Sequence, residues 1–343
     1  MIQIINIEQR SRWDGIVTSF TDYDVYYLTC YVRAFEIHGD GQPNLLYYEQ
    51  DGLRAMYVYM KRTTAVIGIY DSITPYGYGG VLFEGNNDDT HIQAFYSEYV
   101  RIMNEEHIVD NFVRYHPLLA NAQSMKLISN VLDLGQTVAM DLSSPEVIWE
   151  NITSKNRNAI RKAEKNGVQI QHGHSWNELK QFIPMYNATM QKDHAERYYY
   201  FGESFYRSIC DDLAGHFEVF YATLEGEMIA ASIMIFANGK MHYHLSCSQQ
   251  EHRPLSPTNL LLYKAALWGC EQGFNTLHLG GGIGSTDDSL YKFKAAFNRR
   301  SSYRFSIGKE IFDRQAYMRL VDIRREQDPR FNPESQFFPL YKS

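Results

Sequence analysis

The stretch that decides the fold is HFEVFYATLEGEMIAASIMIFANGKMHYHLSCS, residues His216–Ser248. It contains three segments rich in apolar and aromatic residues, separated by Glu225-Gly226 and Asn238-Gly239. An Asn-Gly pair between two such segments is a strong signal for a tight hairpin turn. The stretch therefore predicts three consecutive antiparallel strands.

The residues after this stretch predict a change from antiparallel to parallel pairing. A helical pattern covers Ser256–Gln272, with Pro257 near its start and Gly273 just after its end. Proline is favoured in the first helical turn, and glycine is favoured directly after the last. A further strand is expected in NTLHLG, residues 275–280. A strand, a helix and a strand joined by short connections form a right-handed parallel crossover.

The rest of the chain follows a similar alternation of strands and helices. Strands are expected at 45–50, 54–62, 65–72, 108–116 and 136–142. Helices are expected near 90–106, over 145–167 with a break at Thr153–Ser154, and over 176–192 and 203–213. The predicted class is α/β with mixed sheets, and a second half begins near residue 143.

Composition excludes several classes of protein. Hydrophobic residues make up 44% and charged residues 21% of the 343 residues, which is typical of a globular protein. A net charge of -7 argues against a DNA-coating protein. No secretory signal and no apolar run of about 20 residues is present, so we expect a cytoplasmic protein without an integral membrane segment. Four scattered cysteines and the pair His242/His244 lack the spacing of a metal site, and we expect none.

A glycine-rich loop lies in LHLGGGIGSTDDSLYKFKAAF, Leu277–Phe297. Its glycines, at 280, 281, 282 and 284, do not follow the spacing of a nucleotide-binding loop. Ser285 or Thr286 is the expected N-cap of the next helix, which puts two aspartates, 287 and 288, in its first turn. Carboxylates there would repel a phosphate. The glycines therefore serve a tight turn, or they let the backbone at Gly281 and Gly282 approach a substrate or the other domain.

The helix after this loop draws attention to one lysine. Leu290, Phe293 and Phe297 form an apolar stripe at helical spacing, with Lys294 on its edge and Lys292 pointing away. Lys294 either extends its ammonium to water or turns it toward the interior or a cleft. In a cleft the ammonium could stabilise a developing negative charge.

Two segments are candidates for binding an anion. The helix start His252–Leu261 has Ser256 as the expected N-cap and no acid in its first turn, which leaves the N–H groups around Asn259 for a ligand beside Arg253. The segment Thr153–Val168 carries five basic residues, among which Arg157, Arg161 and Lys165 share one helical face. The alternatives are an ordinary capped helix and a solvated charged face. A basic ridge in an acidic chain favours a polyanionic ligand, such as a nucleotide-sugar, coenzyme A or the end of a tRNA.

Three segments resemble a known family. KNRNAIRKAEKNGV, then HYHLSCSQQEHRPLSPTNLLLYKAALWGCEQGFNTLHLGGG, then SLYKFKAAF are similar to the Fem-type branch of the GNAT acyltransferase superfamily. The early TPYGYGG, Thr74–Gly80, resembles a turn in the first domain of that branch. The resemblance implies tandem GNAT-like domains packed side by side, here residues 1–142 and 143–310, with 311–343 returning to the first domain.

The resemblance also implies an activity: acyl or aminoacyl transfer from acyl-CoA or aminoacyl-tRNA to an amine of a cell-envelope precursor, without a tightly bound cofactor. The acceptor would be a small or nucleotide-linked molecule such as a peptidoglycan peptide, and the acceptor end of tRNA is a possible partner. Lys294 matches the lysine of the family's F-K-x-x-F segment, and His244 is a candidate proton acceptor. The expected substrate-binding residues are Lys155, Arg157, Arg161, Tyr76, Tyr78, Arg253, Ser256, Asn259, Gly281 and Gly282.

A second function remains open at this point. The segment Arg253–Thr258 stands where GNAT enzymes carry their pyrophosphate-binding loop, and its sequence, RPLSPT, differs from that loop. The alternative is therefore a non-catalytic binding module that keeps the fold and recognises a nucleotide-sugar or a peptide.

Overall fold

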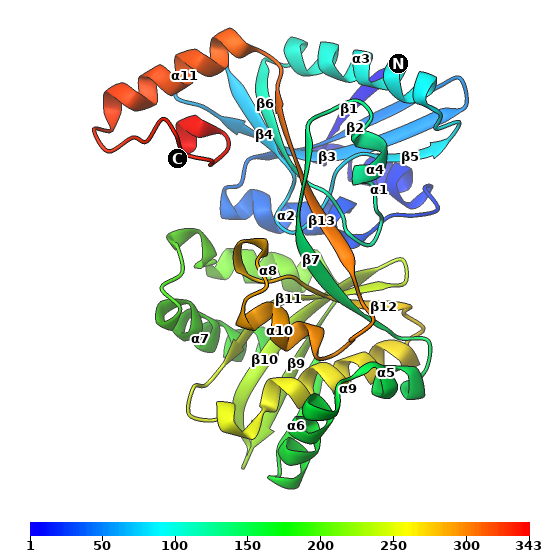
Figure 1. Cartoon of the computed structure of the whole chain (residues 1–343), viewed down its shortest axis with the longest axis vertical. Coiled ribbons are helices and arrows are strands. Elements are labelled where there is room, and N and C mark those ends of the chain that lie inside the picture. Colours follow the sequence, from blue (N-terminus) through cyan, green and yellow to red (C-terminus); the bar gives the residue numbers. More distant parts are fainter. The chain divides into compact units, whose positions relative to one another are not determined.

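The computed structural model describes residues 1–343 and divides into two compact units (Figure 1). Unit 1 comprises residues 1–134 and 305–343, and unit 2 comprises residues 135–304. The boundaries fall inside β7 (Val131–Asp141) and β13 (Tyr303–Ile311), whereas the sequence placed the first boundary just after β7, at 142/143, and the second at the end of β13, at 310/311. The reason is that each strand contributes residues to both units, and a strand pattern in a sequence carries no sign of such a division.

Unit 1 is a mixed sheet with helices. Its strand order is β1-β2-β3-β4-β6-β13, with β5 paired to β3, and only β4 and β6 are parallel. The strands are β1 (Ile2–Asn6), β2 (Gln42–Gln50), β3 (Leu53–Thr63), β4 (Tyr70–Ile73), β5 (Leu82–Gly85) and β6 (Ile108–Arg114). The helices are α1 (Arg10–Thr18), α2 (Thr29–His38), α3 (Asp89–Glu105), α4 (Ala122–Met125) and α11 (Arg314–Gln327).

The prediction of a strand over 65–72 is wrong for its first half. Residues 65–69 form a turn, and β4 begins only at Tyr70. The Thr64 hydroxyl donates a hydrogen bond to the Ile69 carbonyl at 2.9 Å, and Gly68 adopts a positive φ of 81°. A side chain that hydrogen-bonds nearby backbone groups competes with strand pairing, which explains the difference.

Unit 2 is built around a second mixed sheet. Its order is β7-β12-β11-β10-β9-β8, and only β11 and β12 are parallel. The strands after β7 are β8 (Gln169–Gly173), β9 (Phe217–Leu224), β10 (Glu227–Ala237), β11 (Lys240–Ser248) and β12 (Thr276–Gly280). The helices are α5 (Pro145–Asn151), α6 (Ser154–Lys165), α7 (Trp176–Lys192), α8 (Glu203–Asp211), α9 (Pro257–Glu271) and α10 (Ser289–Ala295).

The predicted hairpins and crossover of unit 2 are confirmed. Glu225-Gly226 and Asn238-Gly239 adopt positive φ at both positions, as the tight turns of β9–β10 and β10–β11 require. Helix α9 then connects β11 to its parallel neighbour β12. Every residue of β10 after Glu227 is buried, which requires cover on both faces of the sheet. Helix α7 packs against β10 and β11, and α9 packs against β8, β9, β10 and β12.

Helix α9 contributes much of the core of unit 2. Leu260, Leu261, Leu262, Ala265 and Ala266 are all buried, so the helix is apolar on more than one face. Burying each leucine side chain stabilises the fold by about 1.5–3 kcal/mol. No helix of the chain is both long enough and apolar enough to cross a membrane.

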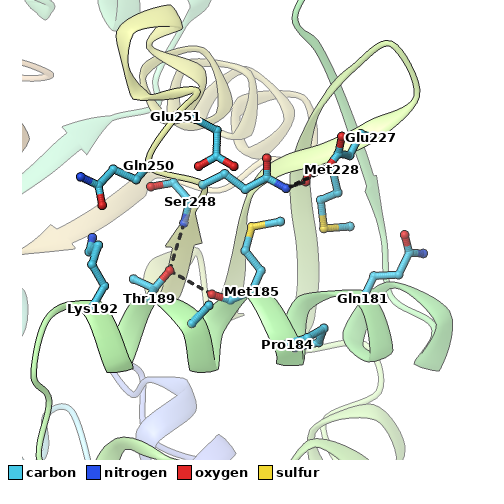
Figure 2. A pocket seen from close by; sticks show the side chains of 12 residues that line it. Gln181, Pro184, Met185, Thr189, Lys192, Glu227, Met228, Ser248, Gln250 and Glu251 are labelled. Carbon is cyan, nitrogen blue, oxygen red and sulfur yellow. Dashed lines mark hydrogen bonds between the residues drawn. The ribbon is translucent and has the colours of Figure 1, made fainter.

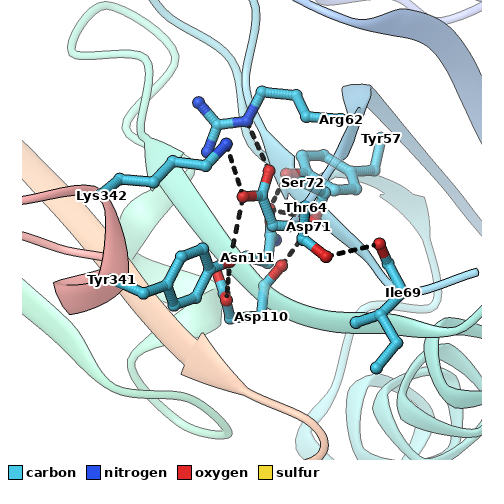
Figure 3. Close-up of polar contacts among 10 residues, drawn as sticks. All are labelled: Tyr57, Arg62, Thr64, Ile69, Asp71, Ser72, Asp110, Asn111, Tyr341 and Lys342. Carbon is cyan, nitrogen blue, oxygen red and sulfur yellow. Dashed lines mark hydrogen bonds and ion pairs between the residues drawn. The ribbon is translucent and has the colours of Figure 1, made fainter. Parts of the chain in front are cut away.

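In unit 1 the residues after α11 are held by a buried polar cluster (Figure 3). The Tyr341 hydroxyl lies 3.0 Å from Asp71 Oδ2 and 2.6 Å from Asp110 Oδ2, and both carboxyl groups are fully buried. Asp71 is also paired with Arg62 and with Lys342. A phenol has one proton and can donate to only one of the two carboxyl groups. The second hydrogen bond therefore needs a proton on a carboxyl group, and Asp110, which has no cationic partner of its own, carries it.

Burial raises the pKa of Asp110 to about 7, in agreement with this proton count. Because the folded-state pKa lies above that of the unfolded chain, the contribution of Asp110 to stability is full below about pH 4 and is lost as the pH rises toward 7. Asp110→Asn replaces the carboxylic acid by an amide that can donate to Tyr341 at every pH. We expect the variant to melt at least about 3 °C above the unmodified protein at pH 8 and near it at pH 5.

Thermal unfolding between pH 5 and pH 8 measures this difference. Asp71→Asn is the matched control: it removes the partner of Arg62 and Lys342 and should lower the melting temperature throughout the range. A constant offset between Asp110→Asn and the unmodified protein would contradict a protonated Asp110.

Candidate functional site in unit 2

The site is formed where β11 and β12 stop pairing. The two strands pair only over Lys240–His242 and Thr276–His278, after which β11 continues to Ser248. A pocket of about 680 Å³ lies along this second half of β11, the start of α9 and α10, within the size range of small-molecule sites. Its lining includes Tyr243, Ser246, Cys247, Ser248, Arg253, Ser256, Thr258, Asn259, Phe293 and Lys294.

Lys294 is the buried cation of this pocket. Its side chain is 8% exposed, and its ammonium donates a hydrogen bond to the Gly281 carbonyl at 2.7 Å. Lys292 on the same helix is exposed, as the periodicity predicted. Burial lowers the pKa of Lys294 to about 8, while Asp288 opposes the shift. The group is thus mostly charged at pH 7 and lies where little water screens it, so it can stabilise a negative charge in the pocket.

The glycine-rich loop positions this lysine and is not an anion site. Asp288, not Ser285 or Thr286, is the N-cap of α10, and its carboxylate accepts hydrogen bonds from the N–H groups of Tyr291 and Ile283. These hydrogen bonds lower the pKa of Asp288. The carboxylate occupies the helix start, so no phosphate can bind there. The expected cap was wrong because the loop folds back on itself through Gly282.

Gly281 and Gly282 are required because neighbouring atoms leave no room for a side chain at either position. A Cβ atom on Gly281 would lie 2.9 Å from the Gln136 carbonyl oxygen. A Cβ atom on Gly282 would lie 2.2 Å from the Thr286 carbonyl oxygen and 2.4 Å from Asp288 Oδ1. At these two positions glycine is needed because other backbone and side-chain atoms come too near for a Cβ atom. These neighbouring atoms belong to unit 2 and not to a substrate or to unit 1.

The start of α9 lies in the same pocket. Ser256 occupies the N-cap position with φ 60° and ψ 43°, but its side chain makes no capping hydrogen bond, contrary to the sequence expectation. The left-handed backbone turns the serine away from the geometry that capping needs. No side chain caps this helix, while Arg253, Thr258 and Asn259 line the pocket beside it. An uncapped helix start with a nearby guanidinium favours an anionic group of a ligand.

The basic residues of helix α6 have different surroundings. The Arg157 guanidinium donates to the carbonyl oxygens of Trp149 and Ile152, at 3.2 and 2.9 Å, and so joins α6 to the end of α5. Arg161 is exposed, with its guanidinium 5.1 Å from the centre of the Trp149 ring. Lys155 is exposed as well. None of these three lines the pocket. Lys162 donates a hydrogen bond to the carbonyl of Pro254 at 2.8 Å, next to the pocket residue Arg253.

His244 does not line the pocket. The pairing of β11 with β10 shifts at this point: Tyr243 faces Met234 and Leu245 faces Ile233, so His244 is the extra residue of a bulge. Burial lowers the pKa of His244 to about 3, with His242 adding to the shift, so the imidazole is neutral and weakly basic. A proton-accepting role is therefore not favoured for His244. A bulge of this kind interrupts the alternation of side chains along β11, and the sequence gives no sign of it.

Tyr76 and Tyr78 belong to unit 1. The Tyr76 ring stacks on Phe35, with centroids 5.4 Å apart, and its carbonyl accepts a hydrogen bond from the Tyr31 hydroxyl. Tyr78 packs edge-on against Tyr26. Both are partly buried members of an aromatic cluster, which gives the TPYGYGG turn a packing role in its own unit.

The pocket residues Tyr243 and Cys247, and Asn156 as the partner of Asn259, were not singled out from the sequence. Tyr243 donates to the Ser246 hydroxyl at 2.5 Å, and burial raises the pKa of Tyr243 to about 12, so it is a neutral hydrogen-bond donor. Burial also raises the pKa of the Cys247 thiol, which leaves it a poor nucleophile. Asn259 donates to Asn156 Oδ1 at 2.6 Å, and Asn156 Nδ2 is buried without a hydrogen-bond partner. The Asn156–Asn259 pair, between residues 103 positions apart, gave no local signal.

The fold and pocket together define the class. Residues 153–295, which lie in unit 2, match the family described as acetyltransferase (GNAT) domain. The crystal structure of FemX superposes with a TM-score of 0.69 at 15% identity, covering 92% of this chain and 99% of FemX. The C-terminal domain of a putative lysylphosphatidylglycerol synthetase from Agrobacterium fabrum superposes with a TM-score of 0.56 at 13% identity, covering 88% of this chain and 91% of that domain. Both show the fold, and the predicted GNAT-like α/β architecture is confirmed.

A relative in sequence indicates which kind of GNAT protein this chain resembles. The UDP-N-acetylmuramoylpentapeptide-lysine N(6)-alanyltransferase of Weissella viridescens is 28% identical over 171 residues, which are 49% of this chain and 50% of that enzyme. The match thus spans about half the length of the relative. These similarities support the Fem-type branch of the GNAT superfamily, to which the sequence motifs also pointed.

The loop geometry yields a prediction about stability. Gly282→Ala places a Cβ atom against the Thr286 carbonyl and the Asp288 carboxylate, so the loop must open and α10 loses its cap. We expect a loss of about 1–3 kcal/mol in the free energy of unfolding by denaturant titration. Gly202→Ala, where the nearest atom would be 3.9 Å away, is the control and should change it by less than about 1 kcal/mol. Equal stability of the two variants would refute the requirement for close approach.

Proposed function

We propose that this protein transfers an acyl or aminoacyl group from an activated ester or thioester to an amine of a peptidoglycan-type precursor. The observation that carries the proposal is the buried ammonium of Lys294 in a pocket with an uncapped helix start. The GNAT domain match and the similarity to an alanyltransferase of the Fem type support the reaction type. The donor is acyl-CoA or aminoacyl-tRNA, and both carry phosphates that suit Arg253 and the start of α9.

The reaction proceeds by direct attack. The neutral amine forms a bond to the donor carbonyl carbon, and the carbonyl oxygen becomes an oxyanion. Lys294 stabilises this oxyanion or the leaving group. The bond to the ester oxygen or thioester sulfur then breaks, and the proton lost by the amine balances the charge of the leaving group. The protonated thiol of Cys247 supports a route without a covalent enzyme intermediate.

Mass spectrometry of the acceptor after incubation with each donor tests the proposal. Suitable reactants are acetyl-CoA, alanyl-tRNA and UDP-N-acetylmuramoyl-pentapeptide. Lys294→Met should lower turnover about tenfold or more, with an unchanged melting temperature. Lys292→Met, on the exposed side of the same helix, is the matched control and should keep nearly full turnover. Full activity of Lys294→Met would remove the lysine from the mechanism, and binding of an acceptor without any acyl product would favour a binding module.

The pH dependence gives a separate prediction. Because the ammonium form of Lys294 is the active one and its pKa is about 8, turnover should decline as the pH rises above 8. Lys294→Arg keeps a positive charge throughout, so its residual turnover should lack this decline. Initial rates from pH 6.5 to 9.5 would measure it. A decline of equal size in both proteins would assign it to another group.

A further inference from the structure

The bulge at His244 brings two hydroxyl groups onto one face of β11. Residues 243 and 246 are three positions apart, so in a regular strand their side chains would lie on opposite faces of the sheet. With the extra residue, Tyr243 pairs with Met234 on β10. Ser246 pairs with Ser232, which is two positions earlier on that strand and hence on the same face. Tyr243 and Ser246 therefore both line the pocket, with their hydroxyl oxygens 2.5 Å apart.

Hydrogen bonds on two sides of β11 hold this arrangement in place. Toward β10, the Ser232 hydroxyl donates to the Leu245 carbonyl at 2.9 Å, next to the bulge. Toward α7, the Ser248 N–H donates to the Thr189 hydroxyl at 3.4 Å, and that hydroxyl donates to the Met185 carbonyl at 2.9 Å (Figure 2). The second half of β11 is thus fixed between its neighbours, and the two hydroxyl groups are positioned before a ligand binds.

The hydroxyl pair has hydrogen-bonding capacity left for a ligand. Tyr243 donates its proton to Ser246, and neither hydroxyl oxygen makes another hydrogen bond in the structure. The proton of Ser246 and a lone pair of Tyr243 are therefore unused. Burial raises the pKa of Tyr243 to about 12, so the phenol gives up its proton only while it receives another.

The direct attack described above needs a path for one proton. The attacking nitrogen must lose a proton, and the leaving oxygen or sulfur must gain one. Arg253 and Lys294 in the lining are cations, and a cation cannot accept it. Burial keeps the Cys247 thiol protonated, and the carboxylate of Asp193 is paired with Lys192 at 3.0 Å. The ionisable side chains of the pocket thus offer no unpaired base.

We propose that Tyr243 and Ser246 carry this proton as a relay, which deepens the proposed function and rests on it. The attacking nitrogen gives a proton to Oη of Tyr243, Tyr243 passes its own proton to Oγ of Ser246, and Ser246 passes its own to the leaving oxygen or sulfur. The bond between the carbonyl carbon and the leaving atom breaks in the same step, and both hydroxyl groups end neutral, as they began. The nitrogen and the leaving atom are bonded to one carbon in the tetrahedral intermediate, so two adjacent hydroxyl groups can contact both. Lys294 stabilises charge while the hydroxyl pair moves the proton.

Removal of either hydroxyl tests the relay in the acyl-transfer assay. Tyr243→Phe and Ser246→Ala should each lower kcat about a hundredfold or more, with KM and the melting temperature nearly unchanged. Ser246→Thr keeps a hydroxyl group and should retain most of the turnover. Tyr221→Phe is the matched control and should leave kcat unchanged, because the Tyr221 hydroxyl bonds to Gln171 on the edge strand β8.

Deuterium separates proton transfer from a structural role of the pair. Single-turnover rates of the unmodified protein should fall along a curve as D2O replaces H2O, because more than one proton moves in the step. Tyr243→Phe and Ser246→Ala should each remove the curvature. The double variant should be no slower than either single variant, since each change breaks the same relay.

The outcomes separate the relay from the reaction. Full rates for both single variants, or a straight isotope dependence in the unmodified protein, would overturn the relay and leave acyl transfer in place. Absence of product from every donor with the unmodified protein would overturn the reaction, and the relay with it.

Discussion

The short parallel pairing of β11 with β12 is the constraint on which unit 2 depends. Three residues of each strand pair, and the strands then separate while α9 crosses between them. Had the pairing continued, the second half of β11 would be covered by its neighbour, and no pocket would be open along it. Because the strands part, Tyr243, Ser246 and Ser248 line a cavity instead. The helix that makes the crossover also brings its uncapped start to that cavity.

Around the pocket, the positions of charged groups depend on the backbone at the starts of α9 and α10 as well as on the charged side chains. Asp288 satisfies the start of α10, and the opposite end of its loop supplies the Gly281 carbonyl that fixes the Lys294 ammonium. One carboxylate therefore keeps anions from α10 while Lys294 remains directed into the pocket. At α9 the reverse holds, since no side chain occupies the helix start. A ligand anion is thus favoured at one helix start and excluded at the other.

In unit 2 the charged side chains Arg253 and Lys294 line the pocket that a ligand would enter. In unit 1, by comparison, charge serves anchoring: Arg62 and Lys342 both pair with the fully buried carboxylate of Asp71 and so hold the residues after α11. Charged side chains thus line a ligand pocket in unit 2, whereas in unit 1 they hold the C-terminal segment in place by ion pairs.

Local chemistry in the sequence determined much of unit 2. The Asn238-Gly239 turn, Pro257 and Gly273 at the ends of α9, and the stripe that turns Lys294 inward each depend on residues only a few positions apart. Only the tertiary structure decided that Asp288 caps α10, that Ser256 is left-handed, that His244 lies in a bulge and that Asn156 meets Asn259. Strand register, loop folding and contacts between distant segments set these features. Short-range periodicity carries no information about the bulge or the Asn156–Asn259 pair, because the deciding partners lie elsewhere in the chain. At Asp288 and Ser256 the partners are near in sequence, but several neighbouring residues could cap and only the folded path of the loop selects between them.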